Sequence, residues 1–287
     1  MPAEKFEAIL SHLKEIGVLQ RWHGTVELHN WSEPTLNPEI DKILAILPRY
    51  RQKGQLSSNF IAPWELAPES YHSLSTVIFS LCSLQEDRYR EIYGADLHTT
   101  LDHFREFLEK RKRHNPKIRV VIHWLQYQFN LDETDAARRF FSGLVFEGLC
   151  FREYRAYLND LQGHLSYCRS GGKEIEGYSL EGTKKDIDFE RVERICANSP
   201  PRFSCGMKGP SFLVITEEGQ LAQCCMVTSK HAEYRLGDIL TMSKKEIVRR
   251  KKSCALSLCR ECEECGFAHF FAGGNECEAS TRDPPAA

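Results

Sequence analysis

The sequence lacks a long apolar run, a leader-like start and an excess of either charge. No stretch approaches the ~18 consecutive apolar residues of a membrane span. The first residues, Met-Pro-Ala-Glu-Lys-Phe-Glu-Ala, include no apolar segment of the signal-peptide kind. The 38 basic and 40 acidic residues leave a formal net charge of −2, which gives no general attraction to nucleic acid. We therefore expect a cytoplasmic protein that binds neither membrane nor nucleic acid.

Paired histidines and internal repeats are absent as well. The 11 histidines show no spacing of the kind that holds a metal ion, and no segment repeats. The length of 287 residues and a hydrophobic content of 41% are sufficient for a sizeable core. We expect one main domain and one smaller domain.

Cysteine, in contrast, is abundant, with 12 residues of which 8 lie between Cys205 and Cys277. Cys259, Cys262 and Cys265 are separated by two residues each, and this spacing brings their sulfurs onto one tight turn where a soft metal can hold several. A cysteine-rich chain without a secretory signal more often binds metal than forms disulfides. A metal or iron–sulfur site is the leading interpretation, and buried apolar cysteines or disulfides are the alternatives.

Further candidate ligands come from separate segments. Cys224 and Cys225 lie at the end of an expected β-hairpin, and Cys205 lies shortly before it. Cys224 and Cys225 cannot readily ligate equally, because adjacent side chains diverge on a strand. Cys254 and Cys277 are candidate extra ligands of a second cluster. We expect Cys82 and Cys150 to be core thiols. Cys168 and Cys196 are not assigned.

The first 160 residues alternate between strand-like and helix-like segments. Helical spacing of apolar residues predicts helices over 3–16, 38–47, 97–112 and 134–144, and apolar or β-branched runs predict strands over 25–29, 55–60, 76–81, 118–125 and 148–154. Strands that alternate with helices of this length imply an α/β fold with a parallel sheet and crossover helices, open or barrel-like.

After residue 160 the alternation of strand-like and helix-like segments ends. Residues 161–202 contain Gly171-Gly172, Pro200-Pro201 and many charges, and we interpret them as a linker. Residues 211–216 and 221–225 then flank a hairpin turn signal, and Ser243 with Glu246 has the capping-box spacing of a helix over 243–252. The predicted domains are therefore 1–160, the linker 161–202, a cysteine-rich domain 203–280 and an unstructured tail 281–287.

The segment from Glu27 to Ile40 resembles the second strand of radical S-adenosylmethionine (radical SAM) enzymes and the Gly-Gly-Glu-Pro turn that follows it. In that family the backbone of this turn, with its acidic residue, holds the methionyl amino group of the cofactor. Ser32 and Glu33 occupy the matching places, with Ser32 where glycine is usual. The alternative is that Glu33 accepts backbone amides in a turn before Pro34.

Two later segments extend the resemblance along the sheet. Leu56-Ser-Ser-Asn59 resembles the third-strand segment whose polar residues approach the ribose and carboxylate of the cofactor. This likeness implies cofactor contacts from Ser57, Ser58 and Asn59, which are otherwise common turn formers. Residues 80–96 resemble the fourth strand and the helix after it. The implied fold is a partial (β/α) barrel of radical SAM type without its first strand.

The stretch from Cys205 onward resembles a SPASM or twitch domain, which carries an auxiliary four-iron (4Fe-4S) cluster. The order in such a domain is a cysteine, a hairpin that ends in cysteine, a Leu-Gly-Asp-Ile segment, a helix and Cys-x-x-Cys. Residues 205–262 follow that order. The implied ligands are Cys205, Cys224 or Cys225, Cys259 and Cys262, with Cys265 as a substitute, and structural zinc on four cysteines is the alternative.

One departure from the family affects the expected activity. The first strand of radical SAM enzymes ends in Cys-x-x-x-Cys-x-x-Cys, and this spacing occurs nowhere in residues 1–287. Reductive cleavage of the cofactor needs an electron delivered through the cluster that these thiolates hold. We expect the chain as given not to start radical chemistry, either because it is truncated at its N-terminus or because it is a natural remnant. The start at the first helix favours truncation.

The resemblance implies an enzyme that modifies an unknown substrate, a small molecule or a peptide, by radical chemistry. An electron donor such as flavodoxin or ferredoxin would be its partner. No catalytic residue is assigned, because substrate contacts in this family come from variable positions. The alternative function is a non-catalytic iron–sulfur or structural-zinc interaction module.

Overall fold

The computed structural model describes residues 1–19, 25–29, 32–144, 148–155, 212–225 and 235–256. Its main part is a five-stranded sheet in the order β1-β2-β3-β4-β5. The strands are β1 (Thr25–Glu27), β2 (Lys53–Ser58), β3 (Leu74–Leu81), β4 (Arg119–Gln126) and β5 (Leu149–Arg155). Every neighbouring pair is parallel. The predicted α/β fold with a parallel sheet is confirmed.

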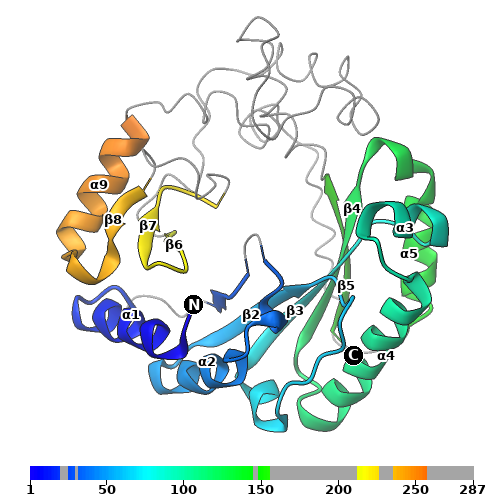
Figure 1. Ribbon diagram of the computed structural model, residues 1–287, viewed down its shortest axis with the longest axis horizontal. Coiled ribbons are helices and arrows are strands. Elements are labelled where there is room, and N and C mark those ends of the chain that lie inside the picture. Colours follow the sequence, from blue (N-terminus) through cyan, green and yellow to red (C-terminus); the bar gives the residue numbers. More distant parts are fainter. Residues whose placement is uncertain (20–24, 30–31, 145–147, 156–211, 226–234, 257–287) are drawn as a thin grey trace, which may run out of the picture.

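The connections between the strands are helical. Helix α1 (Ala3–Glu15) precedes β1, and the connections comprise α2 (Ile40–Ile46), α3 (Glu86–Tyr93), α4 (Leu97–His114) and α5 (Thr134–Ser142), with short 3-10 helices η2 (Pro34–Leu36), η3 (Leu47–Tyr50), η4 (Pro68–Ser73) and η5 (Gln128–Glu133). Figure 1 shows the described elements as an arc with these helices on its outer side and the sheet on its inner side. Helical spacing predicted α1, α2, α4 and α5 close to their observed bounds, whereas η4 and η5 are too short to produce a periodic signal.

The outer face of the sheet is the hydrophobic core. Successive side chains of a strand point to opposite faces, and one alternating set is apolar and fully buried: Leu56, Val77, Phe79, Leu81, Val120, Ile122 and Trp124. Aromatic rings from α4 and from the segment after β2 pack onto this set. The ring centroid of Phe79 lies 4.5 Å from that of Phe104 and 5.1 Å from that of Phe60. The helices therefore pack on the outer face of the sheet around one hydrophobic core.

The C-terminal unit is a small antiparallel sheet with a helix. The sheet has the order β6-β7-β8, from β6 (Val214–Ile215), β7 (Gln220–Ala222) and β8 (Arg235–Asp238), and η8 (Ile239–Thr241) and α9 (Lys244–Leu256) follow. This confirms the predicted hairpin and the predicted helix after it. The Ser243 hydroxyl accepts a bond of 3.2 Å from the Glu246 amide, which is one half of the predicted capping box.

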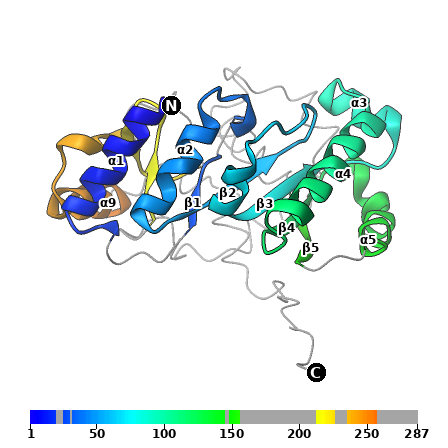
Figure 2. The same ribbon diagram turned by 90° about the horizontal axis from the view of Figure 1, so that it is seen from below.

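Helix α1 connects the two units. The Lys5 ammonium donates to the Glu218 carbonyl at 2.7 Å, and His12 Nε2 lies 2.8 Å from the Met242 carbonyl. From the other side, the Lys244 ammonium donates to the Gly17 carbonyl at 2.9 Å. Figure 2 shows α1 between α9 and α2. Because Phe6 and Ile239 belong to the same buried cluster, α1 holds the C-terminal unit against the sheet layer.

Several predicted features fall outside the described residues. These are the linker 161–202, the tail 281–287 and the cysteines Cys168, Cys196, Cys205, Cys259, Cys262, Cys265 and Cys277. The domain boundaries stay predictions for the same reason. Among the helices that the structure describes, none has the length and apolar character needed to cross a membrane.

Candidate active site on the inner face of the sheet

The inner face of the sheet carries a row of polar side chains near the C-terminal ends of its strands. Ser80 of β3 pairs in register with His123 of β4, and His123 pairs with Arg152 of β5. The Ser57 hydroxyl of β2 lies 3.2 Å from the Ser80 hydroxyl. We call Ser57, Ser80, His123 and Arg152 the polar row. In open α/β sheets ligands bind at the C-terminal ends of the strands, so the polar row is the candidate site.

His123 has a strongly perturbed proton affinity within the polar row. Burial, followed by the positive charges of Arg152 and His29, lowers the pKa of its imidazole to about 4. Burial also lowers the pKa of His29, although the carboxylate of Glu27 opposes that shift. Near neutral pH both rings are therefore uncharged, and a neutral imidazole can donate one hydrogen bond and accept another.

The Glu33 carboxylate connects the turn after β1 to the end of β2. One oxygen accepts from the Asn59 amide at 3.1 Å. The other accepts from the Thr35 amide at 3.3 Å and the Thr35 hydroxyl at 2.7 Å, which caps η2. Glu33 thus accepts backbone amides, as its alternative interpretation expects, and it also brings the two segments of the predicted cofactor site together. Ser32 lies exposed beside it, and the cofactor role of both residues stays a prediction.

The three polar residues at the end of β2 have different surroundings. Ser57 lies in the polar row, whereas Ser58 is buried on the opposite face, where its hydroxyl accepts from the Trp64 indole and the Phe60 amide, both at 3.0 Å. Asn59 forms a turn, since its side-chain oxygen accepts from the Ile61 amide at 3.1 Å. Ser58 therefore supports the local packing, and a ligand at the polar row would meet Ser57.

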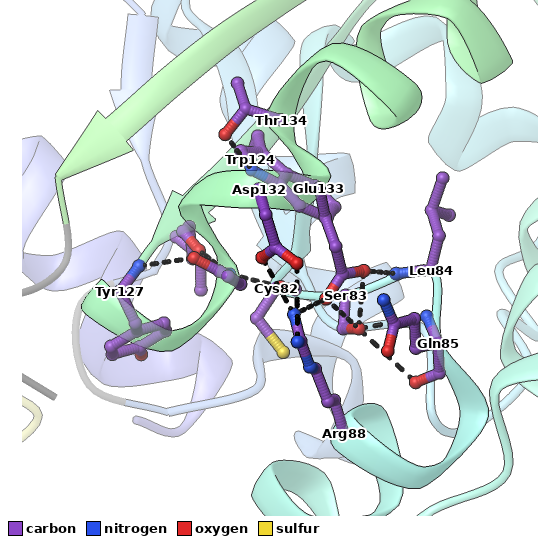
Figure 3. Close-up of polar contacts among 12 residues, drawn as sticks. Cys82, Ser83, Leu84, Gln85, Arg88, Trp124, Tyr127, Asp132, Glu133 and Thr134 are labelled. Atoms are coloured by element: carbon purple, nitrogen blue, oxygen red, sulfur yellow. Dashed lines mark hydrogen bonds and ion pairs between the residues drawn. The ribbon is translucent and has the colours of Figure 1, made fainter. Parts of the chain in front are cut away.

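A buried carboxylate, which the sequence did not reveal, fixes the loop after β3. Glu133 is 5% exposed. Its oxygens accept from the Ser83 hydroxyl at 2.8 and 3.0 Å, the Leu84 amide at 2.9 Å and the Arg88 guanidinium at 2.8 Å (Figure 3). The same guanidinium donates to Asp132 at 2.9 Å. Glu133 thereby ties the end of β3 to the end of η5 and to α3.

Asn130 completes this connection from β4. Its side-chain oxygen accepts from the Tyr127 amide at 2.7 Å, and its side-chain amide donates to the carbonyls of Leu125 and Cys82. Asn130 is fully buried. The loops after β3 and β4 are therefore held together at the edge of the sheet where the polar row lies.

The two cysteines predicted as core thiols differ. Cys82 is fully buried at the end of β3, which confirms the prediction. Burial, followed by the negative charge of Glu133, raises the pKa of its thiol to about 12, so Cys82 stays protonated and is not a nucleophile. Cys150 is only half-buried. It pairs in register with Val121, on the inner face of the sheet, so its assignment to the core was wrong.

The described part of the predicted metal site consists of thiols from two elements. Cys224 and Cys225, two of the predicted ligands, follow β7; Cys254, the candidate extra ligand of a second cluster, lies on α9; and all three are half-buried. Among the described residues no group of three or more histidine, cysteine or acidic side chains is arranged to hold a metal ion. Cys205, Cys259, Cys262 and Cys265 lie outside those residues, so the predicted set of ligands remains a prediction.

One buried side chain next to these thiols has no hydrogen-bond partner among the described residues. Gln223, directly before Cys224, is 1% exposed, and neither polar atom of its side chain is hydrogen-bonded within the described part of the chain. Buried amides are normally hydrogen-bonded. The thiols of Cys224 and Cys225 can ligate a metal, and the side-chain amide of Gln223 can donate hydrogen bonds to metal-bound sulfur. These residues therefore fit a metal group held by thiolates.

Replacing His123 with glutamine is expected to remove a pH-dependent part of the stability. The unfolded imidazole takes up its proton near pH ~6.5, whereas the folded ring does so near about 4. The contribution of His123 is therefore fully present above pH ~6.5 and is lost as the pH falls through about 4, by about 2 to 3 kcal/mol. Urea unfolding of both proteins across this range measures the difference. His72, which is exposed, gives the control variant, and equal pH slopes in wild type and His123→Gln would contradict the expectation.

Comparison with solved structures gives the fold a precedent. The chain is similar to native anSMEcpe with bound AdoMet (S-adenosylmethionine), with 16% identity and a TM-score of 0.52 over 93% of this chain and 79% of that chain. It is also similar to Streptococcus suis SuiB bound to the precursor peptide SuiA, with 15% identity and a TM-score of 0.56 over 96% of this chain and 65% of that chain. SuiB bound to S-adenosylmethionine gives a TM-score of 0.54 at 16% identity.

Sequence comparison does not assign the chain to a family. No protein-family model matches the sequence, and no curated protein matches it. At identities of 15 to 16% the structural likeness concerns the fold alone. The chain therefore shares the fold of anSMEcpe and SuiB, whose solved structures hold S-adenosylmethionine.

Proposed function

We propose that this chain is a radical SAM-type protein: its sheet binds AdoMet at the C-terminal ends of β1 and β2, and its C-terminal unit carries an auxiliary iron–sulfur cluster. The observation that carries the proposal is the hydrogen bond from the Asn59 amide to Glu33. It unites the two segments that resemble the cofactor site of the family, on a fold shared with AdoMet-bound structures.

The proposed site assigns different tasks to neighbouring residues. The turn at Ser32 and Glu33 would hold the methionyl amino group, and Ser57 with Asn59 would approach the ribose and carboxylate. His123 and Arg152, farther along the polar row, would face the substrate. AdoMet supplies a radical that removes hydrogen from the substrate when a reduced cluster lies beside it. The residues of this chain orient the reactants and donate hydrogen bonds to them.

The substrate class and the electron source follow from the same proposal. SuiB binds a precursor peptide on this fold, which supports a peptide substrate, and a small molecule is the second choice. An electron donor such as flavodoxin or ferredoxin would reduce the cluster. Because residues 1–287 lack the Cys-x-x-x-Cys-x-x-Cys spacing, we expect this chain by itself to bind AdoMet without cleaving it reductively.

A second candidate is a non-catalytic iron–sulfur or structural-zinc module, and the same missing spacing favours it. Metal content after anaerobic purification distinguishes the structural-zinc form of this module from the proposed cluster. The proposed cluster gives iron and acid-labile sulfide with visible absorbance, whereas a structural site of four cysteines gives zinc without sulfide. AdoMet binding separates the functions further, since a module without the cofactor site would not bind it.

Replacing Glu33 with alanine is expected to weaken AdoMet binding roughly tenfold or more. The change removes the acceptor of the Asn59 amide, and loss of a charge-assisted bond of this kind costs about 1.5 to 3 kcal/mol. Equilibrium dialysis with labelled AdoMet measures the affinity, and circular dichroism checks that the variant is folded. Glu65→Ala, which alters an exposed acidic residue, is the matched control. Absence of AdoMet binding by the wild-type chain, or equal affinity in a folded Glu33→Ala variant, would reject the proposed site.

A further inference from the structure

Lys251 on α9 is fully buried, with 0% of its surface exposed. Its ammonium donates to the Phe212 carbonyl at 2.6 Å and to the Gln223 carbonyl at 2.9 Å. Lysine is rarely buried to this extent unless its ammonium is hydrogen-bonded or paired. The two carbonyls come from the chain before β6 and after β7. The position of the ammonium is therefore fixed by three separate segments of the C-terminal unit.

This ammonium lies next to the described thiols. The carbonyl of Gln223 that it contacts belongs to the peptide group that leads directly into Cys224. Cys254 follows Lys251 by three residues on α9, and residues with this spacing lie on the same side of a helix. Lys251 thus contacts the segment that leads into Cys224 and shares one side of α9 with Cys254.

Gln223 is an independent sign that this interior receives a ligand. Its side-chain oxygen and nitrogen are both buried without a hydrogen-bond partner in the part of the chain that the structure describes, and Gln223 directly precedes Cys224. A buried amide left unpartnered costs about 1 to 3 kcal/mol. A group with acceptors for the amide N–H, such as metal-bound sulfur, would relieve that cost. The cation at Lys251 and the amide of Gln223 both suit an anionic occupant.

We propose that Lys251 is a positioning residue whose fixed positive charge stabilises the thiolate-ligated cluster of the C-terminal unit and raises its reduction potential. The inference rests on the auxiliary cluster of the proposed function. A cluster on four thiolates carries net negative charge, and each added electron makes it more negative, so a nearby cation favours the reduced form. Burial strengthens this effect because the surroundings screen charge weakly.

The test replaces Lys251 with methionine, which keeps the length of the side chain and removes its charge. Lys252→Met is the matched control, because Lys252 is an exposed neighbour on the same helix. The full chain is reconstituted anaerobically, its iron and sulfide are measured, and the cluster is titrated by electron paramagnetic resonance against redox mediators. We expect Lys251→Met to lower the equilibrium constant for reduction at least tenfold, about 59 mV for one electron, and Lys252→Met to leave it unchanged.

A second variant separates charge from packing. Lys251→Gln keeps N–H donors for a carbonyl of the kind that Lys251 contacts but carries no charge, so it is expected to lower the potential as Lys251→Met does. An iron-loaded Lys251→Gln or Lys251→Met variant with the wild-type potential would overturn the role of Lys251 and leave the proposed function intact. A wild-type chain that takes up no iron and sulfide would overturn both.

Discussion

Replacing Glu133 with alanine is expected to lower the free energy of unfolding by about 3 to 5 kcal/mol. The carboxylate is 5% exposed and accepts from Ser83, Leu84 and Arg88. Its removal leaves the half-buried Leu84 amide without this acceptor, the buried Ser83 hydroxyl with only a longer bond of 3.3 Å to the Gln85 carbonyl, and the Arg88 guanidinium with only its bond to Asp132. Urea unfolding followed by circular dichroism measures the loss. The effect is large because donors that stay buried and unpaired cost more than the bonds themselves contribute.

The neighbouring Asp132 provides the matched control. Its side chain also pairs with Arg88, at 2.9 Å, but it is 63% exposed. An exposed ion pair contributes about 0 to 1 kcal/mol, so Asp132→Ala is expected to have a small effect. Glu133→Gln, which keeps one acceptor oxygen, is expected to fall between the two. If Glu133→Ala costs no more than Asp132→Ala, the loops after β3 and β4 are held by apolar packing and not by this carboxylate.

The regular part of the fold was predictable because local patterns report it. The apolar run over residues 76–81 predicted β3, and helical spacing over 97–112 predicted α4, both within a few residues of the observed bounds. Once strands and helices alternate, a parallel sheet is the expected arrangement. The bonds of Glu133 and Asn130 could not be predicted, because each joins residues about 50 positions apart and leaves no local periodic signal.

The candidate site was predictable in part. The sequence indicated Glu33 and the segment 57–59, and the structure brings them together through one hydrogen bond. The opposite directions of Ser57 and Ser58 follow from strand alternation. His123 and Arg152 were missed because the sequence suggested only ordinary strands over 118–125 and 148–154. One signal for His123 was available in the strand alternation. His123 lies on the same face of β4 as Arg119, whereas Ile122 and Trp124 are buried on the opposite face.

Replacing Cys259 and Cys262 together with alanine is expected to abolish iron binding by the C-terminal unit. Wild-type protein reconstituted with iron and sulfide should hold about four iron atoms per chain in the proposed cluster, and the double variant should hold almost none. Without Cys259 and Cys262 the cluster keeps only two of its four proposed ligands, and Cys265 alone cannot replace both. Iron and sulfide analysis with visible absorbance measures the change.

Stability provides a second measurement of the same variant. Metal binding is coupled to folding in small cysteine-rich domains, so the loss of the cluster should destabilise residues 203–277. The loss should extend to the contacts with α1, because Lys5, His12 and Gly17 bind this unit. Hydrogen exchange at α1 and α9 follows both effects. The control is Cys150→Ala, which removes a half-buried thiol from the sheet and is expected to keep the full iron content. Unchanged iron in the double variant would show that other thiols hold the metal, and zinc in place of iron would identify a structural site.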